Sequence, residues 1–137
     1  MSNLVRFGVS LEKELLQGFD SRIKEQNYTN RSEAIRDLIR EDLVRKAWQE
    51  GKEIAGAITM IYDHHKREVV NKLMDIQHGF GGIIISTSHI HLDHHNCLEV
   101  VVLKGKPSQA QELSDKLKAV KWVKHVTLSM SSTGRDI

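Results

Sequence analysis

Residues 4–11, LVRFGVSL, alternate between apolar side chains and polar or small ones. This alternation predicts a half-buried β-strand. The next two segments, residues 11–26 and 31–49, carry helical patterns and offer no second strand. Because the backbone groups of a strand must be hydrogen-bonded, this strand has to pair with another one, and the simplest solution is a dimer with an antiparallel ribbon. The apolar face of the ribbon would carry Val5, Phe7, Val9 and Leu11.

The two helical segments also favour a dimer, because two helices of this size cannot close a core alone. Asn30 precedes the second helix and Glu33 follows three residues later, a spacing that resembles a capping box. Residues 49–53, QEGKE, lack apolar periodicity and read as a short linker between a domain over residues 1–49 and a domain over residues 53–137. The apolar stripe of the second helix should bury Ile35, Leu38, Ile39, Leu43 and Ala47.

Composition limits the class of protein. The chain has 137 residues, 39% of them hydrophobic and 28% charged, which indicates a soluble globular protein with one domain or two very small ones. No apolar run approaches the length of a bilayer span, so no membrane association is expected. A single cysteine excludes an internal disulfide and favours the reducing cytoplasm. A net charge of +2 gives no argument for nucleic acid, so that argument must come from local placement.

The strand VRFGVSL, the first helix and the stretch NRSEAIRDLIRE together resemble the ribbon-helix-helix DNA-binding family, over residues 3 to about 48. The resemblance implies a ribbon that lies in the major groove, where strand side chains read base edges. It also implies phosphate contacts at the start of the second helix. The implied reading face is Arg6, Gly8 and Ser10, and the implied phosphate anchors are Asn30, Arg31 and Ser32. The alternative is that Arg6 and Ser10 form only a solvated strand face.

The rest of the chain alternates strand and helix patterns. The predicted strands are residues 54–63, 83–92, 96–105 and 122–130, and the predicted helices are residues 64–78 and 107–120. This order is β-α-β-β-α-β, the split arrangement of ferredoxin-like folds. It resembles the ACT domain, a small module that commonly pairs sheets between subunits. The predicted fold class is therefore α+β, a ribbon-helix-helix segment followed by an ACT-type domain.

Four of the eight histidines and the only cysteine lie in residues 86–105. On a strand, residues two apart share a face, so His89 and His91 are neighbours, about 6.6–7 Å apart along the strand. A turn at residues 93–96 then brings Cys97 close to His91 on the antiparallel partner strand. Three soft or borderline ligands thus converge with the spacing H-x-H-x5-C, which predicts a metal site.

Two imidazoles and a thiolate suit zinc, copper or nickel rather than magnesium or calcium. Ligands that lie close to one plane favour Ni(II) or Cu(II). The fourth ligand is not local, and His78 at a helix end is the best candidate. His125 is expected to be an ordinary strand histidine. The remaining four, expected to be solvated turn or helix-start residues, are His64, His65, His94 and His95.

The two halves together resemble the nickel-responsive transcriptional regulator family, with HIHLDHHNCLE as the most specific stretch. The resemblance implies one Ni²⁺ per subunit, held square-planar by His89, His91 and Cys97 of one chain and His78 of the facing chain. It implies a homotetramer, a dimer of dimers, that binds double-stranded DNA operators and represses nickel uptake genes. It further implies that the carboxylate of Glu99 orients the ligating histidines. Glu33 and Asp37 match positions that can hold a second, hard cation at the domain junction. Lys66 and Arg67 match positions near the DNA backbone.

Two other classes stay open. The same ligands could serve a metal-storage or metal-delivery protein that does not bind DNA, although the ribbon pattern argues against it. An antitoxin-like repressor with a protein-binding C-terminal part is the second alternative. An enzyme acting on a small organic substrate is least expected, because no nucleophile–base pair is visible and four protein ligands would leave the metal no open position.

Overall fold

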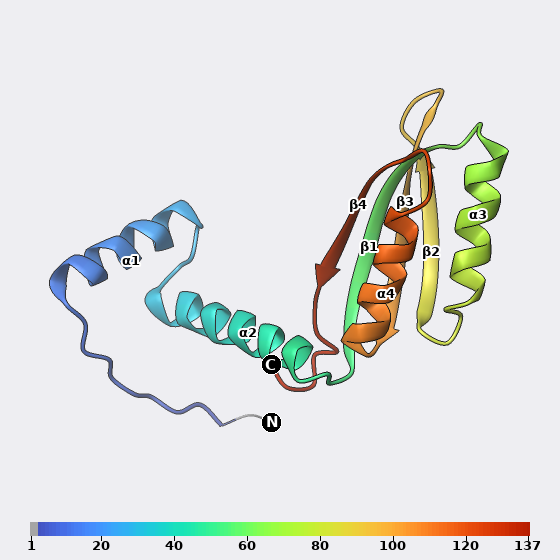
Figure 1. The fold of residues 1–137 in the computed structure, drawn as a ribbon. Coiled ribbons are helices and arrows are strands. Elements are labelled where there is room, and N and C mark those ends of the chain that lie inside the picture. Colours follow the sequence, from blue (N-terminus) through green and yellow to red (C-terminus); the bar gives the residue numbers. More distant parts are fainter. Residues whose placement is uncertain (1–2) are drawn as a thin grey trace. The chain divides into compact units, whose positions relative to one another are not determined.

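The computed structural model describes residues 3–137, which divide into two compact units, the first ending at Arg40 and the second spanning Glu41–Ile137 (Figure 1). No helix in this described range is long and apolar enough to cross a bilayer. The linker and domain bounds expected from the sequence remain a prediction. The elements in chain order are α1 (Lys13–Glu25), α2 (Arg31–Gln49), β1 (Ile54–Asp63), α3 (Arg67–His78), β2 (Ile84–His91), β3 (Asn96–Gly105), α4 (Pro107–Lys118) and β4 (Val123–Met130).

The segment predicted to be the first strand has no strand structure in the single chain. Residues 3–12 carry no regular secondary structure and lie exposed, with Phe7 71% and Val9 58% accessible. The expectation of a strand over residues 4–11 is therefore wrong for the isolated chain. The physical reason is that a strand is defined by its ladder, and this chain supplies no neighbour for these backbone groups.

The connection between α1 and α2 is built from two asparagines. Asn27 has φ 61° in the left-handed region, which asparagine tolerates, and the N–H of Tyr28 donates to the Ile23 carbonyl at 3.0 Å. This pattern closes the C-terminus of α1 as a Schellman motif. At the start of α2 the Glu33 N–H donates to Asn30 Oδ1 at 3.0 Å, which confirms one half of the predicted capping box. The Glu33 carboxylate accepts from the Thr29 N–H at 3.3 Å rather than from the Asn30 N–H that the box requires.

The predicted apolar stripe of α2 is mostly exposed in the single chain. Leu38 is 55% accessible and Ile39 is 49%, whereas Ala34 and, on α1, Ile23 are buried. The prediction that Leu38, Ile39 and Leu43 are buried is wrong for one chain. The two helices of one copy offer too little apolar surface to cover one another, which was also the sequence argument for a partner.

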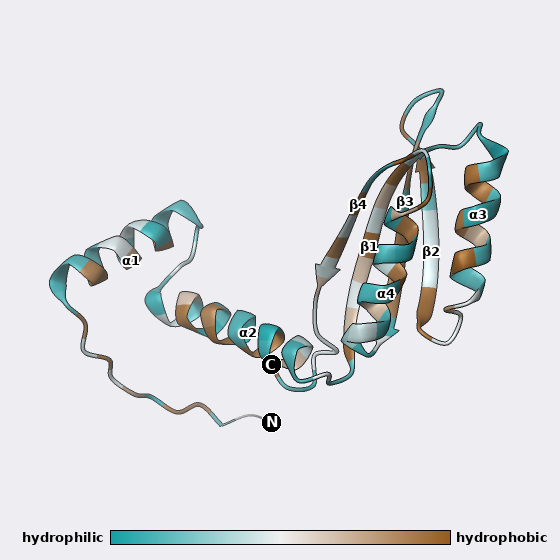
Figure 2. Cartoon of the chain, viewed as in Figure 1, coloured by the Kyte–Doolittle hydropathy of each residue, from teal (hydrophilic) through white to brown (hydrophobic). Residues whose placement is uncertain are grey.

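The second unit contains a four-stranded antiparallel sheet in the order β2-β3-β1-β4. With α3 between β1 and β2 and α4 between β3 and β4, this is the predicted β-α-β-β-α-β fold. Alternate residues of β1 and β3 are buried, because one face of the sheet is covered and the other is not. In Figure 2 the ribbons of α3 and α4 alternate between hydrophobic and hydrophilic colours, as expected for helices with one buried side.

The core lies between the covered face of the sheet and the two helices. Leu113, Leu117 and Val120 from the α4 region join Leu73 of α3 there, as the apolar periodicity predicted. Trp48 near the end of α2 packs against this core and donates from Nε1 to the Ser131 carbonyl at 2.8 Å. This part of the chain therefore closes a core by itself.

Helix α3 begins three residues later than the sequence suggested, at Arg67 rather than His64. The backbone N–H of His65 donates to Asp63 Oδ1 at 2.9 Å and closes a turn directly after β1. An aspartate that accepts from a nearby backbone N–H stabilises a turn in place of the first helical residues. This turn keeps His64 and His65 next to the sheet.

Candidate metal centre and nucleic-acid interface

The register of β2 and β3 places the predicted ligands on one face. His91 lies directly opposite Cys97, and His89 lies directly opposite Glu99. Directly opposed residues of antiparallel strands point to the same side. Cys97 and Glu99 are buried in the middle of the sheet, whereas His89 and His91 are exposed because β2 is an edge strand. The strand parity inferred from the sequence is thereby confirmed.

The side chains stop short of a closed metal shell within the single chain. The rings of His89 and His91 have centroids 6.0 Å apart and are nearly parallel, at 19°. Among residues 3–137, the three ligand atoms that lie within 4.8 Å of one another belong to a different group of side chains. His89, His91 and Cys97 do not bring their ligand atoms this close together. The donor set of two imidazoles and a thiol on one face nevertheless fits a borderline transition ion such as Ni²⁺.

Cys97 is surrounded by residues that control its charge. Burial raises the pKa of the Cys97 thiol, and the charge of Glu99 adds to the rise, while hydrogen bonds from Tyr62 and the Ile90 backbone oppose it. Tyr62, which lies opposite Cys97 on β1, is itself buried. Burial and the hydrogen bond to Glu99 raise the pKa of the Tyr62 phenol above its ordinary value of 10.0. Both groups are therefore neutral near neutral pH in the absence of a metal.

Glu99 is a buried residue whose carboxylate accepts hydrogen bonds from two side chains. Its Oε1 accepts from the Tyr62 hydroxyl at 2.8 Å, and its Oε2 accepts from the Gln77 amide at 2.7 Å. Gln77 precedes His78, the last residue of α3, so the network connects the carboxylate to the helix end that carries His78. The sequence suggested a supporting role for Glu99, but it gave no sign of Tyr62 or Gln77, because both partners depend on long-range packing.

His78 is exposed at the C-terminal end of α3. Ring contacts connect His89 and His91 to other histidines of residues 3–137, but no such contact includes His78. An exposed imidazole away from the other three candidates is free to face another chain.

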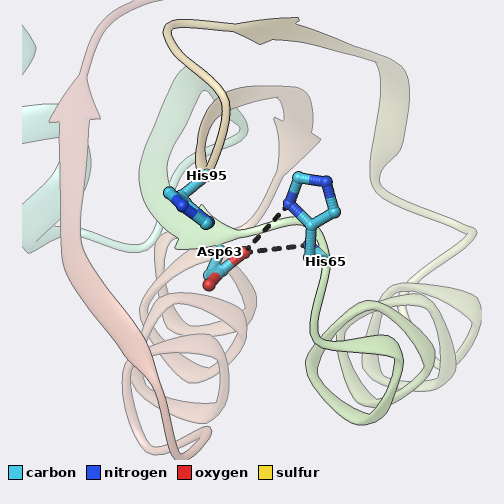
Figure 3. A group of neighbouring side chains, drawn as sticks. All are labelled: Asp63, His65 and His95. Carbon is cyan, nitrogen blue, oxygen red and sulfur yellow. Dashed lines mark hydrogen bonds and ion pairs between the residues drawn. The ribbon is translucent and has the colours of Figure 1, made fainter.

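The histidines expected to be solvated are not all solvated. His64 stacks on His91, with centroids 4.0 Å apart and an interplanar angle of 3°, and its Nε2 is buried without a hydrogen-bond partner among the described residues. His65 and His95 are exposed, but they converge with Asp63 (Figure 3). The sequence interpretation missed this group because it requires the turn after β1 to meet the β2–β3 turn.

The DNA-contacting residues expected from the ribbon-helix-helix resemblance lie at the surface of the first unit. Arg6, Gly8 and Ser10 are exposed in the extended segment, and a Cβ added at Gly8 would meet nothing within 4 Å. Sterics within one chain therefore do not require glycine there. Arg31 forms a two-pronged contact with Asp20, with Nε to Oδ1 and Nη2 to Oδ2 both 2.9 Å. This contact lowers the pKa of the Asp20 carboxyl and fixes the guanidinium against α1, and the neighbouring Asn30 and Ser32 are exposed.

The two carboxylates predicted for a hard cation have partners of their own. Glu33 Oε2 accepts from the Thr29 hydroxyl at 3.0 Å, and Asp37 Oδ2 accepts from the Tyr28 hydroxyl at 2.6 Å. Neither belongs to a group of three converging ligand atoms in residues 3–137.

Lys66 and Arg67, predicted near the DNA backbone, are exposed at the start of α3. The Lys66 ammonium lies 3.5 Å from the centroid of the Trp122 ring, and Trp122 adopts φ 77°. This cation–π contact holds the lysine against the surface of the second unit.

Two family models match successive parts of the chain. The model described as ribbon-helix-helix protein, copG family, matches residues 5–46. The model described as NikR C terminal nickel binding domain matches residues 55–131.

Curated relatives match almost the full length of the chain, and three of them, each named "Putative nickel-responsive regulator", illustrate the similarity. The protein of Syntrophus aciditrophicus is 60% identical over 98% of both chains. That of Chlorobium phaeobacteroides is 58% identical over 96% of this chain and 98% of its own, and that of Pyrococcus furiosus is 53% identical over 98% of both.

A solved structure of an uncharacterized protein from Thermotoga maritima has a TM-score of 0.53 at 16% identity. It covers 58% of this chain and 98% of its own, and it supports the fold alone. The two consecutive matched segments and the full-length relatives agree with the arrangement read from the sequence. The chain belongs to the nickel-responsive regulator family, a family of transcriptional regulators and not of enzymes.

Proposed function

We propose that this protein is a nickel-responsive DNA-binding regulator that acts in the cytoplasm and represses nickel uptake genes when Ni²⁺ occupies a site shared between subunits. The observation that carries the proposal is the register of β2 and β3, which sets His91 opposite Cys97. The exposed His78 of a second chain is the fourth ligand that we propose. One Ni²⁺ is expected per chain.

The shared site gives nickel a physical route to control. Bound Ni²⁺ would supply strong bonds that tie two chains together, and thiolate and imidazole ligands suit this ion. Glu99 would hold the surrounding side chains in place through Tyr62 and Gln77. An interface fixed in this way favours one arrangement of the DNA-binding segments over others, so nickel and DNA should strengthen one another's binding.

The exposed apolar segment supports a dimer of the first unit. Leu4 and Val5 are 91% and 84% accessible, and such residues are expected to pair with a second copy as a two-stranded ribbon. Arg6, Gly8 and Ser10 would then be displayed twice to the base edges, with phosphate contacts nearby. The phosphate anchors we propose are Asn30, Arg31, Ser32, Lys66 and Arg67. Two such dimers joined through the second unit give the tetramer.

Glu33 and Asp37 are further proposed as oxygen ligands of a second, hard cation. Both carboxylates lie in the first unit, and their present hydrogen-bond donors, Thr29 and Tyr28, would have to rearrange for them to ligate. The test is to measure DNA affinity with and without potassium or magnesium. The cation should raise the affinity of the wild type, and Asp37→Asn should lose this gain.

DNA binding with and without nickel tests the main proposal. Fluorescence anisotropy with fragments from upstream of nickel uptake genes should show binding that requires Ni²⁺ in the wild type and is lost in Cys97→Ala. His125→Ala removes an exposed histidine elsewhere in the sheet and should bind like the wild type. Nickel binding without any nickel-dependent retention of DNA would instead favour a storage or delivery protein.

A mixed-subunit experiment tests the shared site. His78→Ala chains and Cys97→Ala chains should each lack the complete ligand set. When the two are unfolded and refolded together, a site made from His78 of one chain and the other three ligands of its neighbour is intact again. Recovery of nickel binding in the mixture is expected, whereas no recovery at any mixing ratio would show that all four ligands come from one chain.

A further inference from the structure

Three side chains outside the proposed nickel site converge at one end of the sheet. Asp63 is the last residue of β1, His65 lies in the turn that follows, and His95 lies in the turn between β2 and β3. One ligand atom of each lies within 4.8 Å of the others (Figure 3). His65 Nδ1 is 3.6 Å from Asp63 Oδ1.

The backbone around this group is fixed by hydrogen bonds on both sides. The β1–β3 register pairs Asp63 with Asn96, and the His64 N–H donates to the His95 carbonyl at 3.1 Å. The two turns are therefore joined directly.

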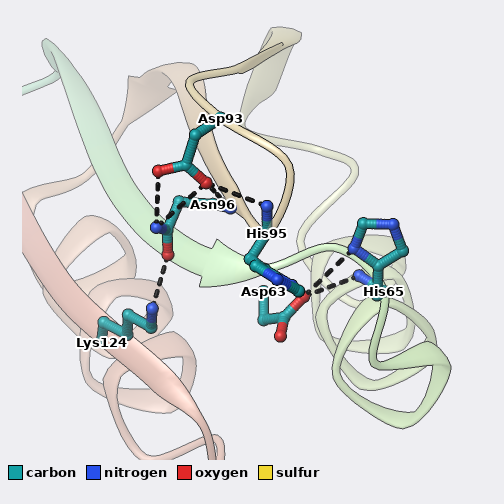
Figure 4. Close-up of polar contacts among 6 residues, drawn as sticks. All are labelled: Asp63, His65, Asp93, His95, Asn96 and Lys124. Carbon is teal, nitrogen blue, oxygen red and sulfur yellow. Dashed lines mark hydrogen bonds and ion pairs between the residues drawn. The ribbon is translucent and has the colours of Figure 1, made fainter.

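The β2–β3 turn is also held from within (Figure 4). Asp93 Oδ1 accepts from the backbone N–H groups of His95 at 2.9 Å and Asn96 at 2.8 Å. Lys124 of β4 donates to Asn96 Oδ1 at 2.5 Å. His95 thus projects from a fixed turn, and ligands on an ordered backbone lose less entropy when they bind an ion.

We propose that Asp63, His65 and His95 form a second, exchangeable site for a divalent first-row transition ion such as Zn²⁺ or Ni²⁺. Two imidazole nitrogens and one carboxylate oxygen are a donor set that these ions accept. Bonds of about 2.1 Å place ligands about 3.0–4.2 Å apart, so the present spread of up to 4.8 Å must close by about an ångström. Both histidines are exposed, and rotation of their side chains can achieve this without moving the sheet.

The chemistry also predicts how the site differs from the proposed nickel centre. Three protein ligands leave positions for water, there is no thiolate, and the site is open to solvent. Metal binding should therefore be weaker and exchange faster than at a site closed by four protein ligands. The inference does not rest on the proposed function, because it uses none of His78, His89, His91 or Cys97.

Zinc titration by calorimetry tests this site in the full chain with Cys97→Ala, which removes the thiolate of the other centre. In that background we expect one Zn²⁺ equivalent per chain. Asp63→Asn, His65→Ala and His95→Ala should each weaken it by at least about tenfold, since disturbing even the groups that support a ligand costs about 10- to 100-fold. His125→Ala is the matched control and should leave the titration unchanged.

A second measurement keeps the result separate from the nickel-responsive centre and guards against misfolding of the Cys97 variant. In the Cys97-containing chain, His95→Ala should lower the total metal bound by one equivalent while the nickel–thiolate absorption band remains. Zinc titrations that superimpose with and without His65 and His95, or metal bound only by chains that retain Cys97, would overturn the proposal. Loss of the thiolate band alone would instead count against the proposed nickel site.

Discussion

Tyr62→Phe is expected to destabilise the protein by about 1.5–3 kcal/mol, the usual contribution of a hydrogen bond to a charged group. The substitution removes only the hydroxyl that donates to Glu99 at 2.8 Å. Glu99 is 8% exposed, so water cannot easily replace the lost donor, and the Gln77 amide at 2.7 Å satisfies only the other carboxylate oxygen. Little volume is lost, which keeps the cavity contribution small.

The measurement is urea unfolding of the metal-free protein at one fixed protein concentration, because the stability of an oligomer depends on concentration. Glu99→Gln and the double variant complete a double-mutant cycle, which isolates the Tyr62–Glu99 interaction from other effects of each substitution. A coupling energy of at least about 1 kcal/mol is expected from the charge-assisted bond. A coupling energy below about 0.3 kcal/mol would refute the argument that this carboxylate depends on the phenol.

Three further predictions concern pH, the turn and the DNA-binding surface. Since folding raises the pKa of Tyr62, the contribution of the neutral phenol to the free energy of unfolding is complete below its ordinary pKa of 10.0 and is lost as pH rises above it. Urea unfolding between pH 9 and 11 should show stability falling more steeply in the wild type than in Tyr62→Phe, by up to about 1.4 kcal/mol per pH unit. Parallel curves for the two proteins would contradict this. Asp93→Ala removes the acceptor of two backbone N–H groups, so hydrogen exchange of the β2–β3 turn should accelerate while β1 stays protected; equal rates in both proteins would show that the turn does not need the carboxylate. Asp20→Asn should raise the affinity for DNA by releasing the Arg31 guanidinium, whereas Arg31→Ala should lower it and reduce the salt slope by about one for each phosphate that is no longer neutralised; an unchanged salt slope would remove Arg31 from the interface.

The second unit was readable from the sequence because its periodicities are local and its core closes within one chain. The strands at residues 54–63 and 96–105 have the predicted bounds, since each carries a clear alternation or a clear apolar run. The start of α3 was not readable. His64 and His65 follow a helical pattern, and only the hydrogen bond between the His65 N–H and Asp63 shows that this stretch is a turn.

Strand parity was sufficient to select His89 and His91, and a short turn was sufficient to bring Cys97 opposite His91. These inferences need only neighbouring strands. The Tyr62–Glu99–Gln77 network and the group of Asp63, His65 and His95 instead depend on how β1 aligns with β3. That register is a long-range property of packing, and no local pattern specifies which turn meets which.

The two functional surfaces proposed for this chain are incomplete in the same way. The extended segment over residues 3–12 has no strand partner in the single chain, and the proposed nickel site needs a fourth ligand beside His89, His91 and Cys97. In the proposed assembly, a second copy supplies what is missing in both cases, although through different contacts. On that proposal, assembly is a condition for both activities rather than an addition to either. Dilution to the point of dissociation should abolish nickel-dependent DNA binding and tight nickel binding together, whereas the open group formed by Asp63, His65 and His95, which lies within one chain, should keep its metal.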